Sequence, residues 1–243
     1  MSESVIQVQN LVSGYDDQIV LNDISFEVIP GEILVILGTS GCGKTTLLKH
    51  LIGLIQPFSG QIKLLGQDLI NSNEKELLNL MRQVGVLFQN GALLNSITVA
   101  ENIAIPLEQH TNLNDRLIED LVHLKLSLVG LSHAANSLPS ELSGGMRKRA
   151  ALARAIALDP KILFADEPGA GLDPVTASSL DRLLLNLRDL LGMTLVVVTH
   201  ELGSIKRIAD RILFLHQGKA VFYGKLSDAL KSDIEPVQRF FNA

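Results

Sequence analysis

One glycine-rich segment of eight residues constrains the fold of this chain more than any other feature. It reads Gly38-Thr39-Ser40-Gly41-Cys42-Gly43-Lys44-Thr45 and fits the pattern G-x-x-x-x-G-K-[ST]. The apolar run Ile33–Leu37, typical of a buried parallel strand, precedes it, and the helix-forming stretch Lys44–Leu54 follows. In that setting, backbone N–H groups at a helix N-terminus converge on phosphate oxygens. The sequence therefore predicts a phosphate-binding loop within an α/β fold.

The side chains of this segment predict that it binds a nucleoside triphosphate and magnesium. We expect Lys44 to reach the β- and γ-phosphates and the hydroxyl of Thr45 to ligate Mg²⁺. The residues expected to contact the nucleotide here are Gly38, Thr39, Ser40, Gly41, Cys42, Gly43, Lys44, Thr45 and Thr46. Cys42 is the only cysteine, and two outcomes are open for it. The helix-start amides and Lys44 favour a lowered thiol pKa, whereas a buried thiol would be unreactive.

A second motif ends another apolar run. Ile162–Ala165 is followed by Asp166 and Glu167, so a buried strand would present two carboxylates at its carboxyl end. Asp166 is suited to hold Mg²⁺ through water, and Glu167 is the candidate general base for a water that attacks the γ-phosphate. Because the chain also carries a phosphate loop, we interpret this pair as functional rather than as an ordinary strand end.

A third motif is a second glycine-rich helix start. The segment Leu142–Met146 places Ser143 as a good N-cap, and Gly144 and Gly145 leave the next amides open. This is a second potential anion site, which one nucleotide does not need from a single chain. It therefore suggests contact with the nucleotide of another subunit, and a simple helix cap is the alternative. The sequence lacks the Asn-Lys-x-Asp motif typical of guanine-specific NTPases.

Composition excludes several other classes. The 21 Lys and Arg residues against 26 Asp and Glu residues give a net charge of −5, whereas nucleic-acid binders are usually basic. A single cysteine rules out an internal disulfide and a Cys-rich metal site. Apolar runs are strand-sized, far below the ~20 residues of a membrane span, and we expect no targeting segment. If the chain works at a membrane, a partner must hold it there.

The order of the predicted elements indicates an α/β fold with a parallel-sheet core. Short strands are predicted near 5–9 and 24–28, and strands and helices alternate again after Lys161. Residues 92–157 favour helix. We expect one domain over 1–243, with a core of about 1–91 and 158–235, a helical subdomain of about 92–157 and a short tail at 236–243.

Taken together, these motifs resemble the ATPase subunits of ABC transporters over nearly the whole chain. Residues 142–146 look like the signature motif, with Met146 in place of the usual Gln. Gln89 matches the Q-loop, and Ala170–Asp173 matches the D-loop. His200 matches the switch histidine, and Tyr15 lies where an aromatic residue stacks on adenine. The resemblance implies a P-loop NTPase fold with antiparallel N-terminal strands and an inserted helical subdomain.

The resemblance also implies a mechanism. Two chains would pack head to tail and sandwich two ATP molecules with Mg²⁺. The residues that one chain would supply to a site are Lys44, Thr45, Gln89, Asp166, Glu167 and His200. The other chain would supply Ser143, Gly144 and Gly145. Asp173 of the D-loop is also expected to contact the nucleotide. His200 would orient the γ-phosphate and the attacking water, and Gln89 would sense Mg²⁺.

Four further segments resemble the branch that powers MCE-type phospholipid transporters of Gram-negative bacteria. These are 140–146, 87–94 with 106–111, and the C-terminal Pro236–Phe241. The implied partners are a polytopic permease, an MCE-domain subunit and a STAS-domain subunit, with the chain at the cytoplasmic face of the inner membrane. An importer of amino acids or other solutes is the alternative. A soluble ABC ATPase that binds nucleic acid is disfavoured, because the chain has one P-loop and no long heptad run.

Two surface features complete the sequence-based predictions. The apolar stretch Ala92–Leu94, with the helical segment Val99–Leu107, would offer a groove for a permease helix, or else form the core of the insertion. The basic trio Arg147-Lys148-Arg149 is interpreted as a solvated helix face, with contact to lipid head groups as the less favoured alternative.

Overall fold

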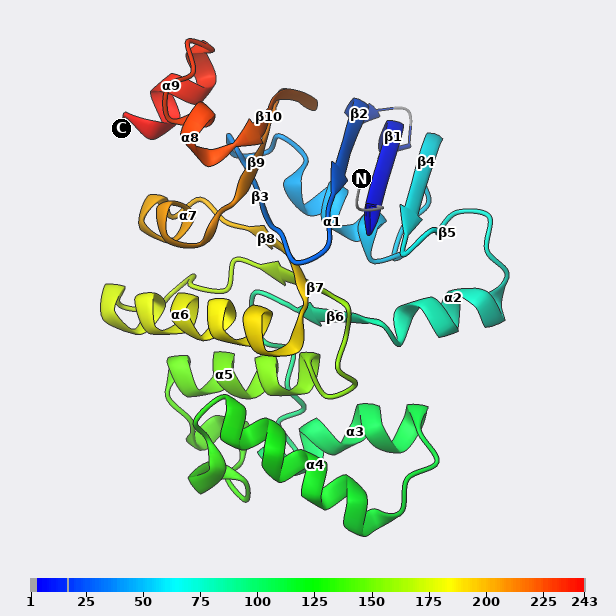
Figure 1. The fold of residues 1–243 in the computed structure, drawn as a ribbon, viewed down its shortest axis with the longest axis vertical. Coiled ribbons are helices and arrows are strands. Elements are labelled where there is room, and N and C mark those ends of the chain that lie inside the picture. Colours follow the sequence, from blue (N-terminus) through cyan, green and yellow to red (C-terminus); the bar gives the residue numbers. More distant parts are fainter. Residues whose placement is uncertain (1–3, 17, 243) are drawn as a thin grey trace.

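The strands of this chain form two sheets, shown in Figure 1. The structure is a computed structural model and describes residues 4–16 and 18–242. The first sheet has four antiparallel strands, in the order β2 (Gln18–Val28), β1 (Ile6–Tyr15), β4 (Ser59–Leu64) and β5 (Gln67–Asp68). The second has six, in the order β10 (Lys219–Lys225), β9 (Arg211–His216), β3 (Ile33–Gly38), β8 (Thr194–Val198), β7 (Ile162–Asp166) and β6 (Val84–Leu87). From β9 to β6 all neighbours are parallel.

Helices surround these sheets. Within the described residues they are α1 (Lys44–Leu51), α2 (Glu74–Met81), α3 (Val99–His110), α4 (Asp115–Leu128), α5 (Gly144–Ala155), α6 (Pro174–Leu191), α7 (Leu202–Ile208), α8 (Leu226–Ala229) and α9 (Glu235–Phe241). Two 3₁₀ turns, Ser132–Ala134 and Pro139–Glu141, precede α5. No helix in the described part of the chain combines the length and apolar character needed to cross a bilayer.

The central strand β3 shows why the predicted parallel core forms. All six of its residues are buried, and successive side chains point to opposite faces of the sheet. Ile33, Val35 and Leu37 join the apolar cluster shared with α5 and α6. Leu34 and Ile36 join the cluster that contains α1 and the N-terminal strands. A continuous apolar run is the pattern that two buried faces require.

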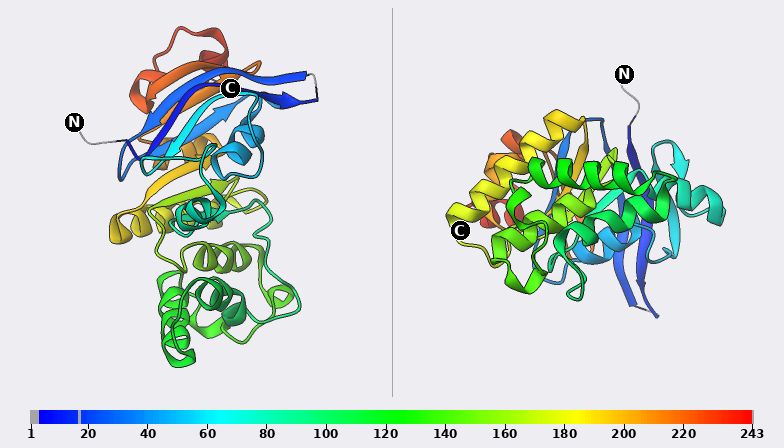
Figure 2. Two further views of the ribbon diagram at one scale, coloured as in Figure 1. Left: turned by 90° about the vertical axis from the view of Figure 1, so that its right-hand side faces the viewer. Right: turned by 90° about the horizontal axis from the view of Figure 1, so that it is seen from below.

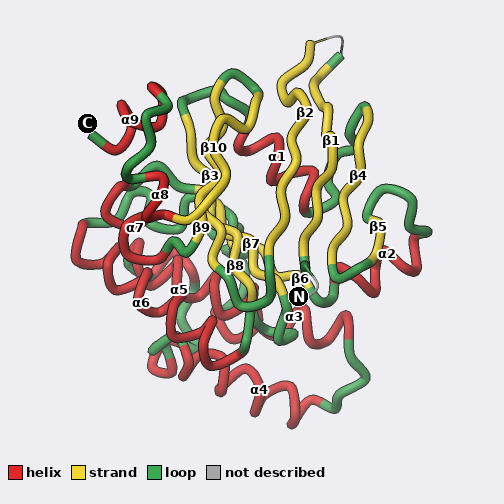
Figure 3. The backbone as a smooth tube through the Cα atoms, turned by 45° about the horizontal axis from the view of Figure 1, so that its top comes forward, coloured by secondary structure: helices red, strands yellow, loops and turns green. Residues whose placement is uncertain are grey.

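The two N-terminal strands are longer than the sequence predicted. Asn10 and Asp23 adopt left-handed backbone conformations, with φ of 48° and 57°, and Nδ2 of Asn10 donates to Oδ1 of Asp23 at 2.8 Å. The register of the β1–β2 pair shifts after Val8. This irregularity breaks the alternation of apolar and polar residues. The predicted strands therefore covered only residues 5–9 of the first strand and 24–28 of the second. Figure 3 shows β1, β2 and β4 side by side.

The segment between β6 and β7 contains α3, α4 and α5, which lie together below the sheets (Figures 1 and 2). Thr98 and Glu101 form a capping box that begins α3. The fully buried Asn102 accepts from the N–H of Leu94 at 2.8 Å and donates to its carbonyl at 3.0 Å. This holds the loop after β6 against the helices. The division into a sheet core and a separate helical subdomain remains our proposal.

Three helices were not predicted. Helix α2 carries a readable signal, because Asn73 and Glu76 form a capping box at its start. Helices α8 and α9 are short, with 4 and 7 residues, and show little periodicity. Helix α9 nevertheless packs on the core: Val237 and Phe241 are buried, and the ring of Phe240 lies edge-on to Phe214 with centroids 5.6 Å apart.

Candidate active site

The glycine-rich segment forms a tight loop between β3 and α1. Gly38 has a φ of 149°, and a Cβ there would lie 2.0 Å from the carbonyl oxygen of Leu215, so only glycine fits. Gly43, with a φ of 101°, is the N-cap of α1. The loop borders a hollow of about 170 Å³ lined by Val20, Gly41, Cys42, Gly43, Lys44, Thr45 and Thr46. The loop and helix start that the sequence predicts are therefore present, in the geometry that suits an anion.

The ammonium group of Lys44 lies over this loop. Its Nζ donates to the carbonyl oxygens of Gly38 at 2.9 Å and of Thr39 at 3.1 Å. Thr45, next along the chain, is exposed, whereas Thr46 is buried. Lys44 and Thr45 are therefore both placed at the hollow, where a phosphate and its cation would bind.

The carboxyl ends of the parallel strands gather the other predicted residues at the same edge of the sheet. Val198 of β8 pairs with Ile36 of β3 on one side and with Asp166 of β7 on the other. Asp166 therefore lies two strand spacings, about 10 Å, from β3, the strand that leads into the phosphate loop. His200 follows β8, and Gln89 follows the edge strand β6.

Glu167 and His200 contact each other. Nδ1 of His200 lies 2.7 Å from Oε1 of Glu167, while Oε2 of Glu167 is buried with no hydrogen-bond partner among the described residues. Glu167 has a left-handed φ of 44°, and its N–H donates to the carbonyl of Val198 at 2.8 Å. A non-glycine residue in this conformation stores strain, which is common at functional sites. One oxygen of the Glu167 carboxylate therefore contacts His200, and the other has no hydrogen-bond partner among the described residues.

Neighbouring charges act on Asp166. Burial raises the pKa of its carboxyl, and the adjacent Glu167 carboxylate raises it further. The ammonium groups of Lys148 and Lys44 oppose both effects. A divalent cation placed here would relieve the repulsion between the two carboxylates.

The basic trio is not a solvated face, contrary to the prediction. Lys148 is only 8% exposed, and its Nζ donates to the carbonyl oxygens of Gln89 and Glu167. Arg149 donates to the carbonyl of Val129 and to Oγ of Ser179. Arg147 alone is exposed. The pattern was misleading because a long side chain on a helix start can turn inward when backbone carbonyls converge on it.

The second glycine-rich turn lies apart from the phosphate loop. Ser143 caps α5, with its Oγ accepting from the N–H of Met146 at 3.3 Å. Gly144 lines a hollow of about 320 Å³ with Gln89, Asn90, Gly91, Arg147, Lys148, Ala170, Gly171 and Leu172. This hollow shares no lining residue with the one at Lys44. Within one chain, therefore, the second turn does not complete the first site.

The predicted Asp173 has a local structural role. Its Oδ1 accepts from the N–H groups of Val175 and Thr176 at 3.0 Å each, which caps α6 ahead of Pro174. Hydrogen bonds from Thr176 and Val175 hold the pKa of this carboxyl below its usual range. A role toward a nucleotide remains a prediction.

Tyr15 lies at the end of β1 and is 47% exposed, so a base could stack on it. The neighbouring strand β2 contributes Val20 to the phosphate-loop hollow. Sequence analysis missed Val20, because one apolar residue in a strand carries no signal of a ligand. It also missed Arg154, which donates to the carbonyls of Gly91 and Ala92 at 2.9 and 2.8 Å.

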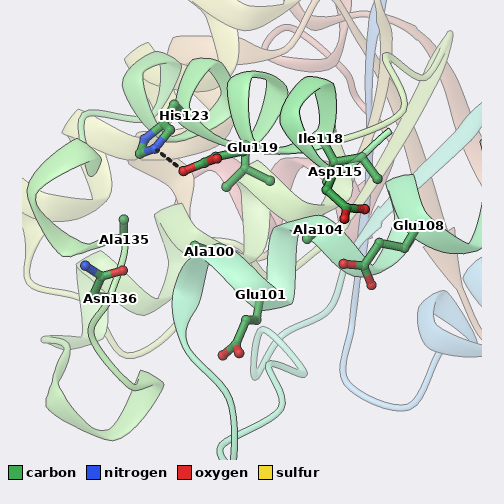
Figure 4. A pocket seen from close by; sticks show the side chains of 11 residues that line it. Ala100, Glu101, Ala104, Glu108, Asp115, Ile118, Glu119, His123, Ala135 and Asn136 are labelled. Atoms are coloured by element: carbon green, nitrogen blue, oxygen red, sulfur yellow. Dashed lines mark ion pairs between the residues drawn. The ribbon is translucent and has the colours of Figure 1, made fainter. Parts of the chain in front are cut away.

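Two further hollows lie on the helical side. One, of about 270 Å³, lies between the packed helices α3 and α4 and is rimmed by carboxylates, with Glu119 paired to His123 at 4.0 Å (Figure 4). It contains none of the predicted site residues. The other, of about 320 Å³, is lined in part by Leu78, Met81, Phe88, Pro106, His110 and Arg154. We take this hollow as the groove expected for a permease helix. It includes Pro106 of α3 as predicted, but it is lined by α2 and Phe88 instead of Ala92–Leu94.

Of the two outcomes open for Cys42, the structure shows a buried thiol. The residue is 3% exposed, and burial raises the pKa of its thiol despite the opposing charge of Lys44. The expectation of a lowered pKa is wrong because loss of hydration outweighs the nearby ammonium and amides.

A maleimide should therefore label Cys42 slowly at neutral pH, at least about tenfold more slowly in the native chain than in the denatured chain. Saturating Mg-ATP should change that rate little, because the protein rather than the nucleotide covers the thiol. Cys42→Ser has no thiol and gives the background. Rapid labelling of the empty native chain that Mg-ATP prevents would show that the thiol is accessible.

The fold and the loop together define a P-loop nucleotide-binding protein, and comparisons with known proteins agree. The profile of the ABC transporter family matches residues 21–170. The intermembrane phospholipid transport system ATP-binding protein MlaF of Haemophilus influenzae is 40% identical over 239 residues, 98% of this chain and 90% of that protein. The probable ribonucleotide transport ATP-binding protein mkl of Mycobacterium leprae is 40% identical over 237 residues, 98% of this chain and 68% of that protein.

A solved structure shows the same architecture. The dimeric post-hydrolysis state of the ATP-binding cassette MJ0796, bound to ADP and Pi, matches with a TM-score of 0.83 and 30% identity, over 91% of this chain and 98% of that chain. The chain belongs to the ABC transporter family. The resemblance drawn from the sequence motifs is thereby confirmed, whereas the roles of the single residues remain proposals.

Proposed function

We propose that this chain is the ATP-binding and ATP-hydrolysing subunit of a membrane transporter for phospholipids, and that it acts as a head-to-tail dimer. The observation that carries this proposal is that the Lys44 loop lies at the same edge of the sheet as Asp166 and the contacting pair Glu167 and His200. The family supports an ATP-dependent transporter subunit. The name of MlaF, from a relative aligned over nearly the full length, supports the phospholipid substrate.

The loop binds the phosphates of ATP. Amides between Gly38 and Thr46 surround the β-phosphate, and Lys44 exchanges its carbonyl partners for phosphate oxygens, which are stronger partners for an ammonium. Tyr15 supports the adenine, and Val20 closes the adjacent side of the hollow.

Magnesium fits the residues present. The hydroxyl of Thr45 borders the phosphate hollow, and the buried carboxylate of Asp166 is repelled by Glu167. Oxygen ligands of this kind, together with phosphate oxygens, are what Mg²⁺ prefers, and Gln89, in the turn after the edge strand β6, would supply another. When bound, the ion neutralises charge on the phosphates.

Hydrolysis then requires a positioned water and a base. The carboxylate of Glu167 accepts a proton from the water that attacks the γ-phosphate. His200 holds one oxygen of this carboxylate and lies where it can orient the γ-phosphate. Most of the acceleration comes from positioning and charge neutralisation.

The second copy completes each site. The exposed Ser143 and Gly144, with Gly145, present a helix start that no nucleotide of the same chain reaches, because its hollow is separate from the phosphate loop. In a head-to-tail dimer this turn faces the γ-phosphate on the partner, with Asp173 near the shared interface. The dimeric form of the MJ0796 cassette supports this arrangement.

A permease holds the subunit at the cytoplasmic face of the inner membrane. Its helix docks in the hollow between α2 and α3, where the apolar Leu78 and Phe88 are exposed beside Pro106. MCE-domain and STAS-domain subunits complete the complex. The relative mkl is as similar as MlaF, and its name gives ribonucleotide transport, so the cargo needs a direct test.

The test is purification of the complex through a tag on this chain from a detergent extract, with identification of its subunits and its bound lipids. A permease with bound phospholipid is expected. Leu78→Asp, which places a charge in the docking hollow, should lose the permease and keep ATP binding. Leu190→Asp, at an exposed leucine of α6, is the matched control that should keep both. A permease free of lipid, together with ATP turnover stimulated by a nucleoside or another solute, would contradict the phospholipid assignment.

A further inference from the structure

Lys148 is a buried cation that the mechanism above does not use. It lies in the second turn of α5, five residues after the exposed Ser143, and is 8% exposed. Its Nζ donates to the carbonyl oxygen of Gln89, in the loop after β6, and to that of Glu167, after β7, the latter at 3.2 Å. One ammonium thus joins three segments that are far apart in the sequence.

Each of these contacts falls on the backbone of a proposed site residue. The carbonyl of Glu167 also accepts from the N–H of Ala170 at 3.1 Å, and the N–H of Glu167 is held by Val198. These bonds maintain the left-handed conformation of Glu167, which is strained and needs support from its surroundings. Arg154, from the last turn of α5, fixes Gly91 and Ala92 in the same loop as Gln89.

The charges around Lys148 fit the same role. Asp166, Glu167 and Glu201 stabilise its ammonium against the loss of hydration on burial, which lowers its pKa. A lysine inside a protein needs such partners. A neutral side chain of the same length would leave two carbonyls without this donor and three neighbouring carboxylates without this counter-charge.

We propose that Lys148 is a positioning residue for ATP hydrolysis, which ties the helix carrying the Ser143 turn to the backbones of Gln89 and Glu167 of the same chain. The proposal rests on the proposed function, since it presupposes that Glu167 and Gln89 act on ATP. It also links the two sites of a dimer: α5 begins at the turn that faces the partner's nucleotide, and its second turn holds the base of its own site.

The test compares Lys148→Met, Lys148→Arg and Lys161→Met in the complex purified through the tagged chain. Lys148→Met keeps the length of the side chain and removes the donor. We expect kcat to fall about 10- to 100-fold, because small displacements of catalytic groups have effects of this size. The Kd for ATP should change less than about threefold, since the phosphate loop is intact. Lys148→Arg, which can donate to both carbonyls, should restore most of kcat. Lys161→Met changes an exposed lysine that immediately precedes β7 and should match the natural protein.

The outcomes separate the two levels of the account. If the natural complex binds ATP but does not hydrolyse it, the proposed function fails. If the natural complex hydrolyses ATP and Lys148→Met matches it, the positioning role is overturned. Equal losses in kcat and ATP affinity, with no rescue by Lys148→Arg, would likewise overturn it in favour of a purely structural role. If Lys148→Met does not fold, Lys148→Gln replaces it, and natural activity in Lys148→Gln would contradict the need for an ammonium.

Discussion

Glu167→Gln is expected to lower ATP turnover by about 100- to 10,000-fold, the usual range for removal of a general base. The amide cannot take the proton of the attacking water, although it retains the size and position of the carboxylate. ATP binding should persist because the phosphate loop is unchanged. Size measurements with Mg-ATP should then show a stable dimer of two 26.4 kDa chains, since the closed state is no longer resolved by hydrolysis.

The control for this variant is Glu119→Gln, the same change at an exposed glutamate of α4, away from the sheet edge. It should hydrolyse ATP at the natural rate. Near-natural turnover in Glu167→Gln itself would remove Glu167 from the role of base and would leave its contact with His200 without a catalytic purpose.

Ser143→Arg should lower the rate of ATP hydrolysis by about 100-fold or more. The monomer should keep its natural affinity for ATP. The arginine fills the helix start that the partner's γ-phosphate would occupy. Within one chain this turn and the phosphate loop line separate hollows, so binding by the monomer should be unaffected. Equilibrium binding of ATP to dilute protein and a turnover assay at high protein concentration measure the two effects.

Gly144→Asp separates loss of the anion site from loss of the helix cap. Ser143→Arg removes a cap worth about 1 kcal/mol, whereas a carboxylate at Gly144 strengthens the helix start and repels phosphate. The position has room for a side chain, because a Cβ would meet only Leu172, at 3.6 Å. Both variants should lose hydrolysis. Loss of ATP affinity by either one as a monomer would show that the turn acts within its own chain.

The sequence predicted the parallel core and the nucleotide loop because both depend on local signals. The apolar run at Ile33–Leu37 requires two buried faces, and Gly38 requires the close approach of Leu215 that only glycine allows. The carboxylates at Asp166 and Glu167 could be placed because parallel strands end at a common edge. That common edge also brings Glu167 and His200 near each other, but the sequence does not give the 2.7 Å contact between them.

Features that depend on distant contacts escaped prediction. The burial of Lys148 is set by carbonyls 59 and 19 residues away, and nothing in its neighbours distinguishes it from Arg147, which is exposed. The state of Cys42 depended on the balance between burial and the charge of Lys44, and burial prevailed. The length of β1 and β2 was missed because the irregularity at Asn10 interrupts the alternating pattern.

The most direct test of the composite site is ATP turnover by a mixture of Ser143→Arg and Lys44→Ala chains, each inactive alone. A mixed dimer combines both lesions in one site and leaves the other site intact, with the loop from one chain and the helix start from the other. Random pairing in equal amounts should restore turnover, to about a quarter of the natural rate when the two sites act independently. A mixture that stays as inactive as its parents, although the chains pair, would contradict the head-to-tail sharing of residues on which the account depends.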